Sequence, residues 1–114
     1  MARRIKLAWW TRLTSRPWRI VAEIESADEI PATLPKNGAV LVVARKKHKW
    51  IAFDCPCHLH HRILLNLDTT RYPHWRVSFG KKKRLTISPS VNSSDSGVYC
   101  HYFIREGKVL WAKD

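Results

Sequence analysis

The chain is poor in cysteine, glycine, methionine and acidic residues. Its 114 residues include three cysteines, four glycines, one methionine and nine Asp or Glu. Two of the cysteines flank Pro56, and a single intervening residue makes a disulfide between Cys55 and Cys57 strained. The odd count and this spacing argue against a disulfide-bonded secreted domain and favour a reducing, cytoplasmic setting.

The chain also lacks a long hydrophobic run. An uninterrupted apolar stretch such as residues 39–44 is far shorter than the roughly 20 residues that cross a bilayer, so we expect no membrane-spanning helix. Residues 1–12 carry the charge of a signal peptide but contain neither its apolar segment nor a small-residue cleavage site. We therefore expect a soluble protein, without membrane partners, whose N-terminus belongs to the mature chain.

What the chain does contain is enough apolar surface for one core. Hydrophobic residues make up 45% of it, as in globular domains, and its length suits a single domain over residues 1–114. Short runs with strand periodicity alternate with turn-forming segments. This pattern predicts an all-β or β-dominated fold with minor α content, either a small sandwich or a partly open barrel of about six or seven short strands.

The expected elements are set by the apolar alternation and by the proline, glycine and charged segments that interrupt it. Strands are expected at residues 38–45, 49–55, 62–67, 75–79, 84–88, 98–105 and 109–112, while residues 18–25 suit either a strand or a helical turn. Turns are expected at residues 46–48, 68–73, 80–83, 89–97 and 106–108, with a short capped turn at residues 26–31.

Thiols and imidazoles crowd the segment between residues 55 and 61. Zinc-binding residue types stand at Cys55, Cys57, His58, His60 and His61, and four ligands complete a tetrahedral site. Paired cysteines of structural zinc sites are usually separated by two to four residues, so a single intervening residue is a weak indication. The segment is therefore either a metal site, to which Cys100 adds a ligand if its strand lies alongside, or an ordinary turn between strands.

A serine and a histidine form a second candidate site. Ser90 follows Pro89, whose ring restricts the backbone at the end of an expected strand, and His101 lies on the next expected strand. A histidine there can accept the proton of a serine nucleophile. The alternative is an ordinary Ser-Pro-Ser turn and a structural histidine. Cys100 is a less suitable nucleophile, because neighbouring residues on a strand point to opposite faces.

Basic residues dominate the charge of the chain, whose formal net charge is +12. They cluster in the N-terminal segment 1–19, which contains no acid, and at residues 45–49 and 81–84. Tryptophans lie among them, a combination that suits stacking on nucleic acid bases. No DNA-binding helix pattern or RNA-binding aromatic motif accompanies the charge. The clusters therefore indicate docking of either a nucleic acid or an acidic protein.

Several short motifs occur in the order found in one bacterial family. They are Phe53-x-Cys55-Pro-Cys57, His-Arg-Ile-Leu-Leu-Asn-Leu at residues 61–67, Pro-His-Trp ending at Trp75, Ile-Ser-Pro-Ser-Val at residues 87–91, and His-Tyr-Phe-Ile-Arg-x-Gly-x-Val-x-Trp at residues 101–111. In these motifs the chain resembles a small bacterial domain family encoded beside ubiquitin-like proteins, E1-like activating enzymes and E2-like proteins. The resemblance covers residues 38–112, which we take as a β core.

The resemblance implies a serine peptidase that processes or removes a ubiquitin-like modifier. It maps the nucleophile onto Ser90 and the base onto His101, with the ubiquitin-like protein or its conjugates as substrate and the E1-like and E2-like proteins as possible partners. Backbone N–H groups of residues 89–97 are then candidates to stabilise the oxyanion. Asp54 and Asp95 are candidates for the residue that orients the histidine, although a dyad is an alternative.

The chain departs from the family at positions that resemble a structural zinc site in its members. Leu59 and Val98 occupy positions at which the family usually has cysteine. Replacement of both by apolar residues is what we expect if the metal site was lost. His58, His60 or His61 are alternative ligands, so zinc is retained as a hypothesis and no other cofactor is expected. The leading hypothesis is thus a serine hydrolase. The alternatives are a non-catalytic basic binding module and a metal-binding interaction domain.

Overall fold

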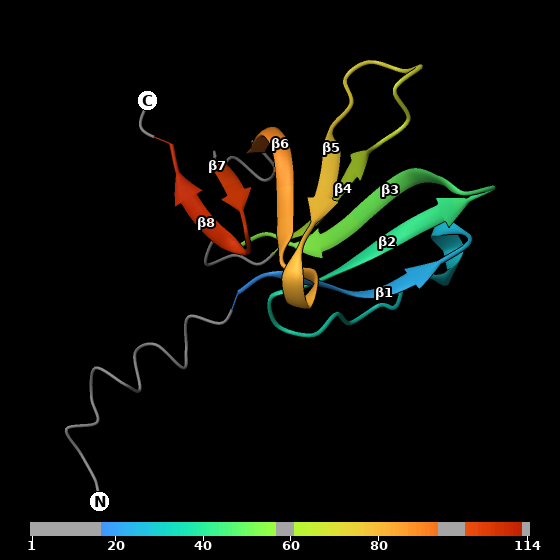
Figure 1. The fold of residues 1–114 in the computed structure, drawn as a ribbon, viewed down its shortest axis with the longest axis horizontal. Coiled ribbons are helices and arrows are strands. Elements are labelled where there is room, and N and C mark those ends of the chain that lie inside the picture. The colour runs from blue at the N-terminus through green and yellow to red at the C-terminus, as the bar shows by residue number, and fades with distance from the viewer. Residues whose placement is uncertain (1–16, 57–60, 94–99, 113–114) are drawn as a thin grey trace, which may run out of the picture.

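The computed structural model describes residues 17–56, 61–93 and 100–112. Within them the chain forms eight strands and two short 3-10 helices (Figure 1). In chain order these are β1 (Arg19–Ile24), η1 (Ala27–Glu29), β2 (Gly38–Ala44), β3 (Lys47–Asp54), β4 (Arg62–Asn66), β5 (Arg76–Phe79), η2 (Lys81–Lys83), β6 (Leu85–Ser93), β7 (Cys100–Arg105) and β8 (Lys108–Trp111). The prediction of a β-dominated fold is therefore confirmed.

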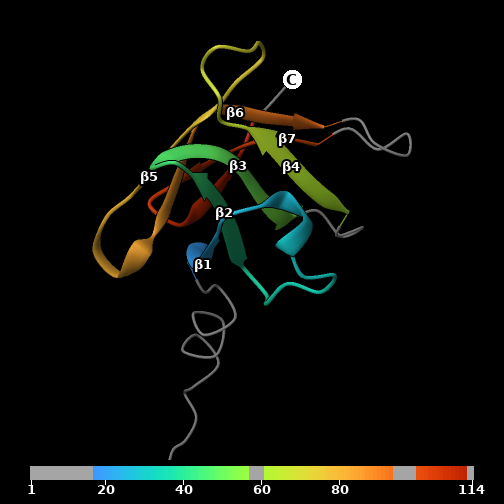
Figure 2. The ribbon, with the colours of Figure 1, turned by 90° about the vertical axis from the view of Figure 1, so that its right-hand side faces the viewer.

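The strands form two four-stranded sheets, in the orders β1-β2-β3-β4 and β5-β6-β7-β8, which Figures 1 and 2 show from two directions. In the first sheet β1 runs parallel to β2, whereas β2, β3 and β4 pair antiparallel. The second sheet is antiparallel throughout. Residues 67–75 carry the chain from β4 to β5, and therefore from the first sheet to the second.

One hydrophobic core lies between the two sheets. Buried side chains from both belong to a single cluster, with Phe53 of β3 and Tyr102 of β7 among the largest that are fully enclosed. Along β7 the buried residues alternate with more exposed ones, as expected for a strand with one face on a core. The shared core identifies the fold as sandwich-like, so of the two predicted architectures the sandwich is confirmed.

Backbone hydrogen bonds join the sheets where the described chain begins. The N–H of Trp18 donates to the carbonyl oxygen of Gly107 at 2.8 Å, and the N–H of Leu85 donates to the carbonyl oxygen of Trp18 at 3.0 Å. Gly107 has a φ of +83°, and a Cβ atom placed there would lie 2.7 Å from the Cβ of Pro17. Both the conformation and the close approach require glycine at this junction.

We expect Gly107→Ala to lower the free energy of unfolding by about 2 kcal/mol or more, because the positive φ and the overlap with Pro17 are both unfavourable for alanine. Urea denaturation measures this loss. Gly80→Ala is the matched control, since no atom lies within 4 Å of a Cβ built at Gly80. Equal losses in the two variants would show that the junction at Gly107 is not under this constraint.

Three local predictions differ from the structure. The strands number eight in the described residues rather than six or seven, because residues 19–24 are a strand parallel to β2. The β2–β3 turn is at Arg45 and Lys46, both with positive φ, and not at residues 46–48. Most important, the expected turn at residues 89–97 begins as strand, since β6 continues to Ser93 and pairs with β7.

Two other predictions agree with the structure, and a third falls largely outside the described residues. Residues 26–31 form a short capped turn, in which the Glu29 carboxylate accepts a hydrogen bond from the N–H of Ser26 at 3.1 Å. In the part of the chain that the structure describes, no helix is long and apolar enough to cross a membrane. The basic segment 1–19 lies mostly outside the described residues and stays a prediction.

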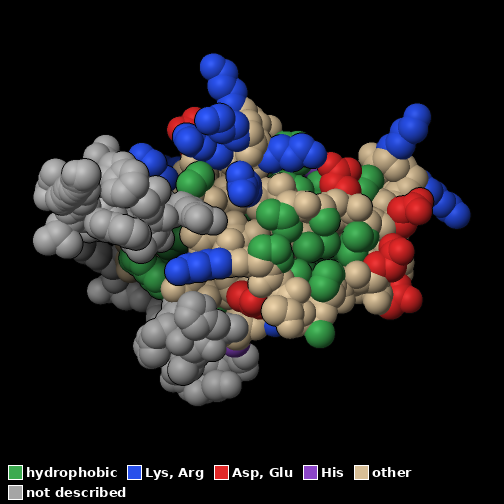
Figure 3. All heavy atoms as spheres, turned by 90° about the horizontal axis from the view of Figure 1, so that it is seen from below, with side chains coloured by type: hydrophobic (Ala, Val, Ile, Leu, Met, Phe, Trp, Pro, Cys, Tyr) green, Lys and Arg blue, Asp and Glu red, His purple; other side chains and the backbone are tan. Residues whose placement is uncertain are grey.

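Charge is unevenly distributed over the described surface. Exposed acids of β1 and η1 lie close together in the sequence, at Glu23, Glu25, Asp28 and Glu29. Figure 3 shows acidic side chains gathered at the end of the molecule where β1 and η1 lie in Figure 1, with hydrophobic side chains across the middle of this face. Lysine and arginine side chains lie beside these acids at the same end and also elsewhere on this face (Figure 3).

Candidate active site

Ser90 lies in the second half of β6, within an irregularity in the pairing with β7. Ile87 pairs with Ile104 and Val91 pairs with Tyr102, so the register shifts across Ser88, Pro89 and Ser90. Val91 is buried in the core, whereas Ser90 is half-buried and Asn92 is exposed. Because side chains alternate along a strand, Ser90 and Asn92 share the outer face of the second sheet.

His101 projects from β7 onto the same outer face. It pairs in register with Asn92, and its neighbours Cys100 and Tyr102 are buried on the opposite face. The distance between the Ser90 Oγ and the His101 Nε2 is 2.9 Å. This is within hydrogen-bond reach for a hydroxyl that donates to an unprotonated ring nitrogen. The fold thus brings together the two residues that the sequence singled out.

Two residues that the sequence did not single out hold the strand around Ser90. The indole Nε1 of Trp75 donates a hydrogen bond to the carbonyl oxygen of Ser90 at 3.1 Å. The backbone N–H of Trp75 in turn donates to the carbonyl oxygen of Asn66 at 2.9 Å. The Asn66 side chain bridges the intervening loop, because its amide donates to the carbonyl oxygens of Asp68 and Pro73. The end of β4 therefore positions the tryptophan that contacts the serine backbone.

The sequence carries only a weak signal for these residues. The Trp-Arg-Val-Ser-Phe run at residues 75–79 is typical of an ordinary strand, and Asn66 is typical of a polar residue near a strand end. Asn92, two residues after Ser90, is not expected at the site, because residues 89–97 are predicted to form a turn. A strand there places Asn92 beside Ser90 and opposite His101.

An outer row of side chains continues from His101 along β7. The rings of His101 and Phe103 have centroids 6.2 Å apart at an interplanar angle of 33°. The guanidinium of Arg105 lies 5.0 Å from the centroid of the Phe103 ring, in the range of a cation–π contact. The His101 imidazole therefore lies next to the Phe103 ring on its own strand, and the Arg105 guanidinium in turn contacts that ring.

Asp54 and Asp95 are the predicted candidates for a residue that orients the histidine. Asp54, at the end of β3, forms an ion pair with Arg62 across the β3–β4 ladder, with 2.9 Å between Oδ1 and Nε. The same guanidinium donates to the carbonyl oxygen of Ala32 at 2.9 Å. The Asp54 carboxylate therefore links two strands of the first sheet through its ion pair with Arg62. Asp95 lies outside the described residues.

The candidate zinc ligands divide between the core and the undescribed segments. Cys55 is fully buried and its Sγ accepts a hydrogen bond from the Tyr102 hydroxyl at 3.4 Å. Cys100 is buried at the start of β7, two residues before Tyr102. Cys100 thus lies on the same buried face of β7 as the tyrosine that contacts Cys55, and its part in a zinc site stays a prediction. Two thiols are half of a tetrahedral zinc site.

The other predicted zinc ligands lie mostly outside the described residues, as Cys57, His58 and His60 do, together with the replaced positions Leu59 and Val98. Among the residues that the structure does describe, no group of three or more His, Cys, Asp or Glu side chains could hold a metal ion. The backbone N–H of Cys55 donates to the carbonyl oxygen of His61 at 2.7 Å, which closes the loop between them. A structural zinc at this loop stays a prediction.

Comparison with known proteins adds a family to this geometry. No curated protein and no solved structure matches the chain. The model of one protein family, described as "Bacterial ubiquitination-like system serine protease (BubE)", matches residues 26–112. The match includes Ser90 and His101 and begins before the residues 38–112 expected from the motifs. Because it spans most of the 114 residues, the chain belongs to the family of serine proteases of bacterial ubiquitination-like systems.

Proposed function

We propose that the chain is a serine peptidase or isopeptidase-like hydrolase that processes or deconjugates a bacterial ubiquitin-like protein. Ser90 is its nucleophile and His101 its general base. The proposal is carried by one observation, the 2.9 Å between the Ser90 Oγ and the His101 Nε2 on the outer face of the second sheet. Membership of a serine protease family supports the same chemistry. The alternative of a non-catalytic basic module assigns no task to this pair.

The chemistry proceeds in two halves. His101 Nε2 removes the hydroxyl proton as the Ser90 Oγ attacks the carbonyl carbon of the modifier's C-terminal residue, and a tetrahedral oxyanion forms. The bond to the leaving group then breaks, and the imidazolium returns the proton to the departing atom. Water, deprotonated by the same imidazole, attacks the acyl-serine ester, and the modifier leaves with a free carboxylate while Ser90 recovers its proton.

The donors for the oxyanion are constrained by Pro89, which has no N–H. The N–H groups of Ser90 and Val91 are then the candidate donors within β6 itself. Trp75 fixes the Ser90 carbonyl and so the plane of the next peptide unit. Trp75 is in this scheme a positioning residue, because it acts through the backbone and does not touch the reacting atoms.

A fluorophosphonate probe tests the proposal directly, because such reagents phosphonylate serines whose hydroxyl is activated by a base. We expect one adduct per chain, located at Ser90 by peptide mass spectrometry, together with hydrolysis of a modifier fusion at the modifier's C-terminus. Labelling at a different serine, or labelling that persists in Ser90→Ala, would contradict the assignment. Cleavage that requires added metal and proceeds without labelling would contradict the reaction class.

Trp75→Phe is expected to slow fluorophosphonate labelling of Ser90 about three- to tenfold. Phenylalanine keeps an aromatic ring in place but removes the hydrogen bond to the Ser90 carbonyl oxygen, which is worth about 1 kcal/mol. Labelling measures the serine alone, without a contribution from substrate docking. Trp111→Phe is the matched control, because Trp111 packs its ring on Tyr102 and is 54% exposed. If both variants label at the wild-type rate, Trp75 does not position Ser90.

Asp54→Asn is expected to change the rate of modifier cleavage less than about twofold. The substitution weakens an exposed ion pair with Arg62, and such pairs contribute at most about 1 kcal/mol to stability. Steady-state cleavage rates and a urea denaturation curve separate the two effects. A drop in kcat of about a hundredfold with unchanged stability would instead make Asp54 the residue that orients the catalytic histidine.

A further inference from the structure

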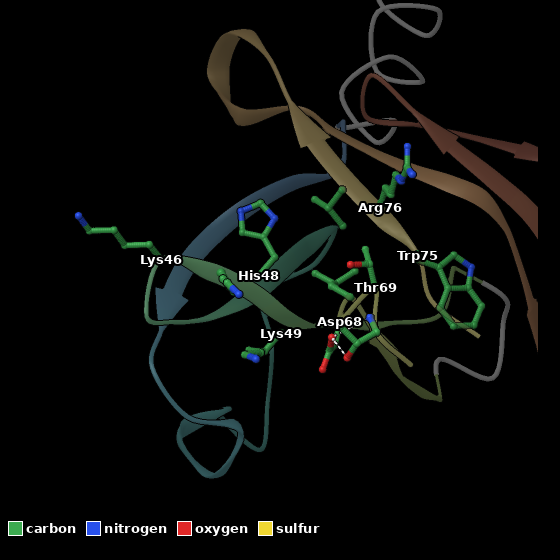
Figure 4. Close-up of a pocket in the computed structure, with 11 residues that line it drawn as sticks. Lys46, His48, Lys49, Asp68, Thr69, Trp75 and Arg76 are labelled. Atoms are coloured by element: carbon green, nitrogen blue, oxygen red, sulfur yellow. Dashed lines mark hydrogen bonds between the residues drawn. The ribbon is translucent and has the colours of Figure 1, made fainter. Parts of the chain in front are cut away.

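A basic groove lies where the β2–β3 hairpin, the segment after β4 and the start of β5 meet. It has a volume of about 740 Å³, within the range of sites that bind small ligands or peptide segments. Its walls come from three parts of the chain that are distant in sequence: residues 46–49 at the β2–β3 hairpin, residues 67–70 after β4, and residues 75–77 at the start of β5. Figure 4 shows Lys46 and Lys49 on one side of the groove and Trp75 on the other.

The charge of the groove is positive. Lys46, Lys47, Lys49 and Arg76 line it, and Asp68 is the one acid among its lining residues. Hydrogen bonds from Thr70 lower the pKa of Asp68, so that this carboxylate is ionised, and Lys49 and Arg71 lie near enough to offset its charge. The ion pairs found among the described residues involve neither Lys47 nor Arg76. Both side chains are exposed, Lys47 at the start of β3 and Arg76 at the start of β5.

The groove is connected to the candidate nucleophile through Trp75. This residue lines the groove, and its indole Nε1 is bound to the carbonyl oxygen of Ser90. The next residue, Arg76, pairs with Ser88 in the β5–β6 ladder. Trp75 is therefore the residue that the groove and the strand of the candidate nucleophile have in common.

The lining favours a polypeptide over a nucleic acid. Leu67, Val77 and Trp75 supply apolar surface next to the lysines, whereas binding of single strands relies on several aromatic platforms for successive bases. The polar edge of the indole is already used on Ser90. A polypeptide with alternating acidic and apolar side chains matches both the basic and the apolar residues that line the groove.

We propose that this groove binds an acidic, extended segment of the substrate polypeptide and guides it past Trp75 to Ser90. The inference rests on the proposed hydrolase function, whose specificity it would explain. The lysines attract the acidic side chains, and the apolar residues between them contact Leu67 and Val77. The ligand of the basic residues in the β2–β3 hairpin and in β5 is thus an acid-rich stretch of the substrate near its scissile bond.

Binding to the full chain carrying Ser90→Ala tests the groove without requiring cleavage. The probe is a fluorescent peptide of alternating glutamate and leucine, compared with its glutamine counterpart and with a single-stranded oligonucleotide. We expect the glutamate peptide to bind, and Lys47→Glu with Arg76→Glu to raise its Kd at least about tenfold, because two attractions become repulsions. Lys36→Glu with Lys108→Glu, which makes the same charge change at exposed sites outside the groove, should raise Kd less than about threefold.

Equal weakening in the two double variants would overturn the proposal, because diffuse charge would then explain binding. So would equal affinity for the glutamine peptide, or tighter binding of the oligonucleotide that excludes the glutamate peptide. In the active chain the groove variant should raise KM for an acidic substrate and leave kcat unchanged. If no substrate is cleaved while groove-dependent peptide binding persists, the hydrolase proposal fails and the groove stands as an acidic-peptide site.

Discussion

Ser90→Ala is expected to lower kcat/KM for a modifier fusion by about ten-thousandfold or more. The variant removes the Oγ that lies 2.9 Å from the His101 Nε2, and loss of a serine nucleophile leaves only the part of catalysis due to binding and oxyanion stabilisation. The fold should be retained, because the side chain is half-buried on the outer face and fills no part of the core. Release of the modifier with time, followed by gel or mass spectrometry, measures the loss.

Ser88→Ala is the matched control for this variant. Ser88 is the same residue type on the same strand and is exposed, and it pairs with Arg76 through its backbone. We expect its cleavage rate to remain within about twofold of wild type. Residual cleavage by Ser90→Ala at a tenth of the wild-type rate or more would rule out Ser90 as the nucleophile.

His101→Ala is expected to lower kcat by about a thousandfold or more. General-base catalysis by a positioned histidine contributes about a hundred- to ten-thousandfold, and this histidine acts first as base and then as acid in each half-reaction. The cavity left on the outer face opens toward Ser90, so imidazole added to the buffer should restore part of the rate. That rescue is the readout that distinguishes a lost base from a damaged fold.

His74→Ala is the control for the histidine, since the His74 ring contacts the carbonyl oxygen of Arg71 in the loop before β5. It should cleave at nearly the wild-type rate and gain nothing from imidazole. If His101→Ala retains cleavage within tenfold of wild type, Ser90 is activated by another group. If fluorophosphonate labelling is lost in His101→Ala while cleavage persists, the labelled serine is not the nucleophile for the modifier.

Strand periodicity predicted most of the fold. The alternation of β3 and β7 and the apolar run of β2 appear in the structure within a few residues of their expected bounds, because one face of each strand must enter the core. The main error was β6. Proline, serine and asparagine at residues 88–93 are typical of a turn, but pairing of Val91 with Tyr102 keeps this segment in the sheet. Tertiary pairing there overrides local preference.

The candidate site divides in the same way. Spacing and family motifs suggested Ser90 and His101, but only the strand of His101 was expected from its own sequence, since Ser90 lies in a segment that favours a turn. Their contact depends on the register that sets Asn92 opposite His101, and a shift of one residue would turn the serine to the core face. No local pattern determines such a register between a bulged strand and its neighbour.

The composition and the apolar pattern of the sequence determined the class of fold and the sign of the charge by themselves. The short apolar runs predicted a core built from strands, and the basic excess favoured an acidic partner. The tertiary structure decided which of the basic residues lie together. The groove joins the β2–β3 hairpin, the loop after β4 and the start of β5 beside Trp75, which holds Ser90. Charges add along the chain, but an electrostatic site requires them to converge in space, and the contact between the two sheets brings these segments together.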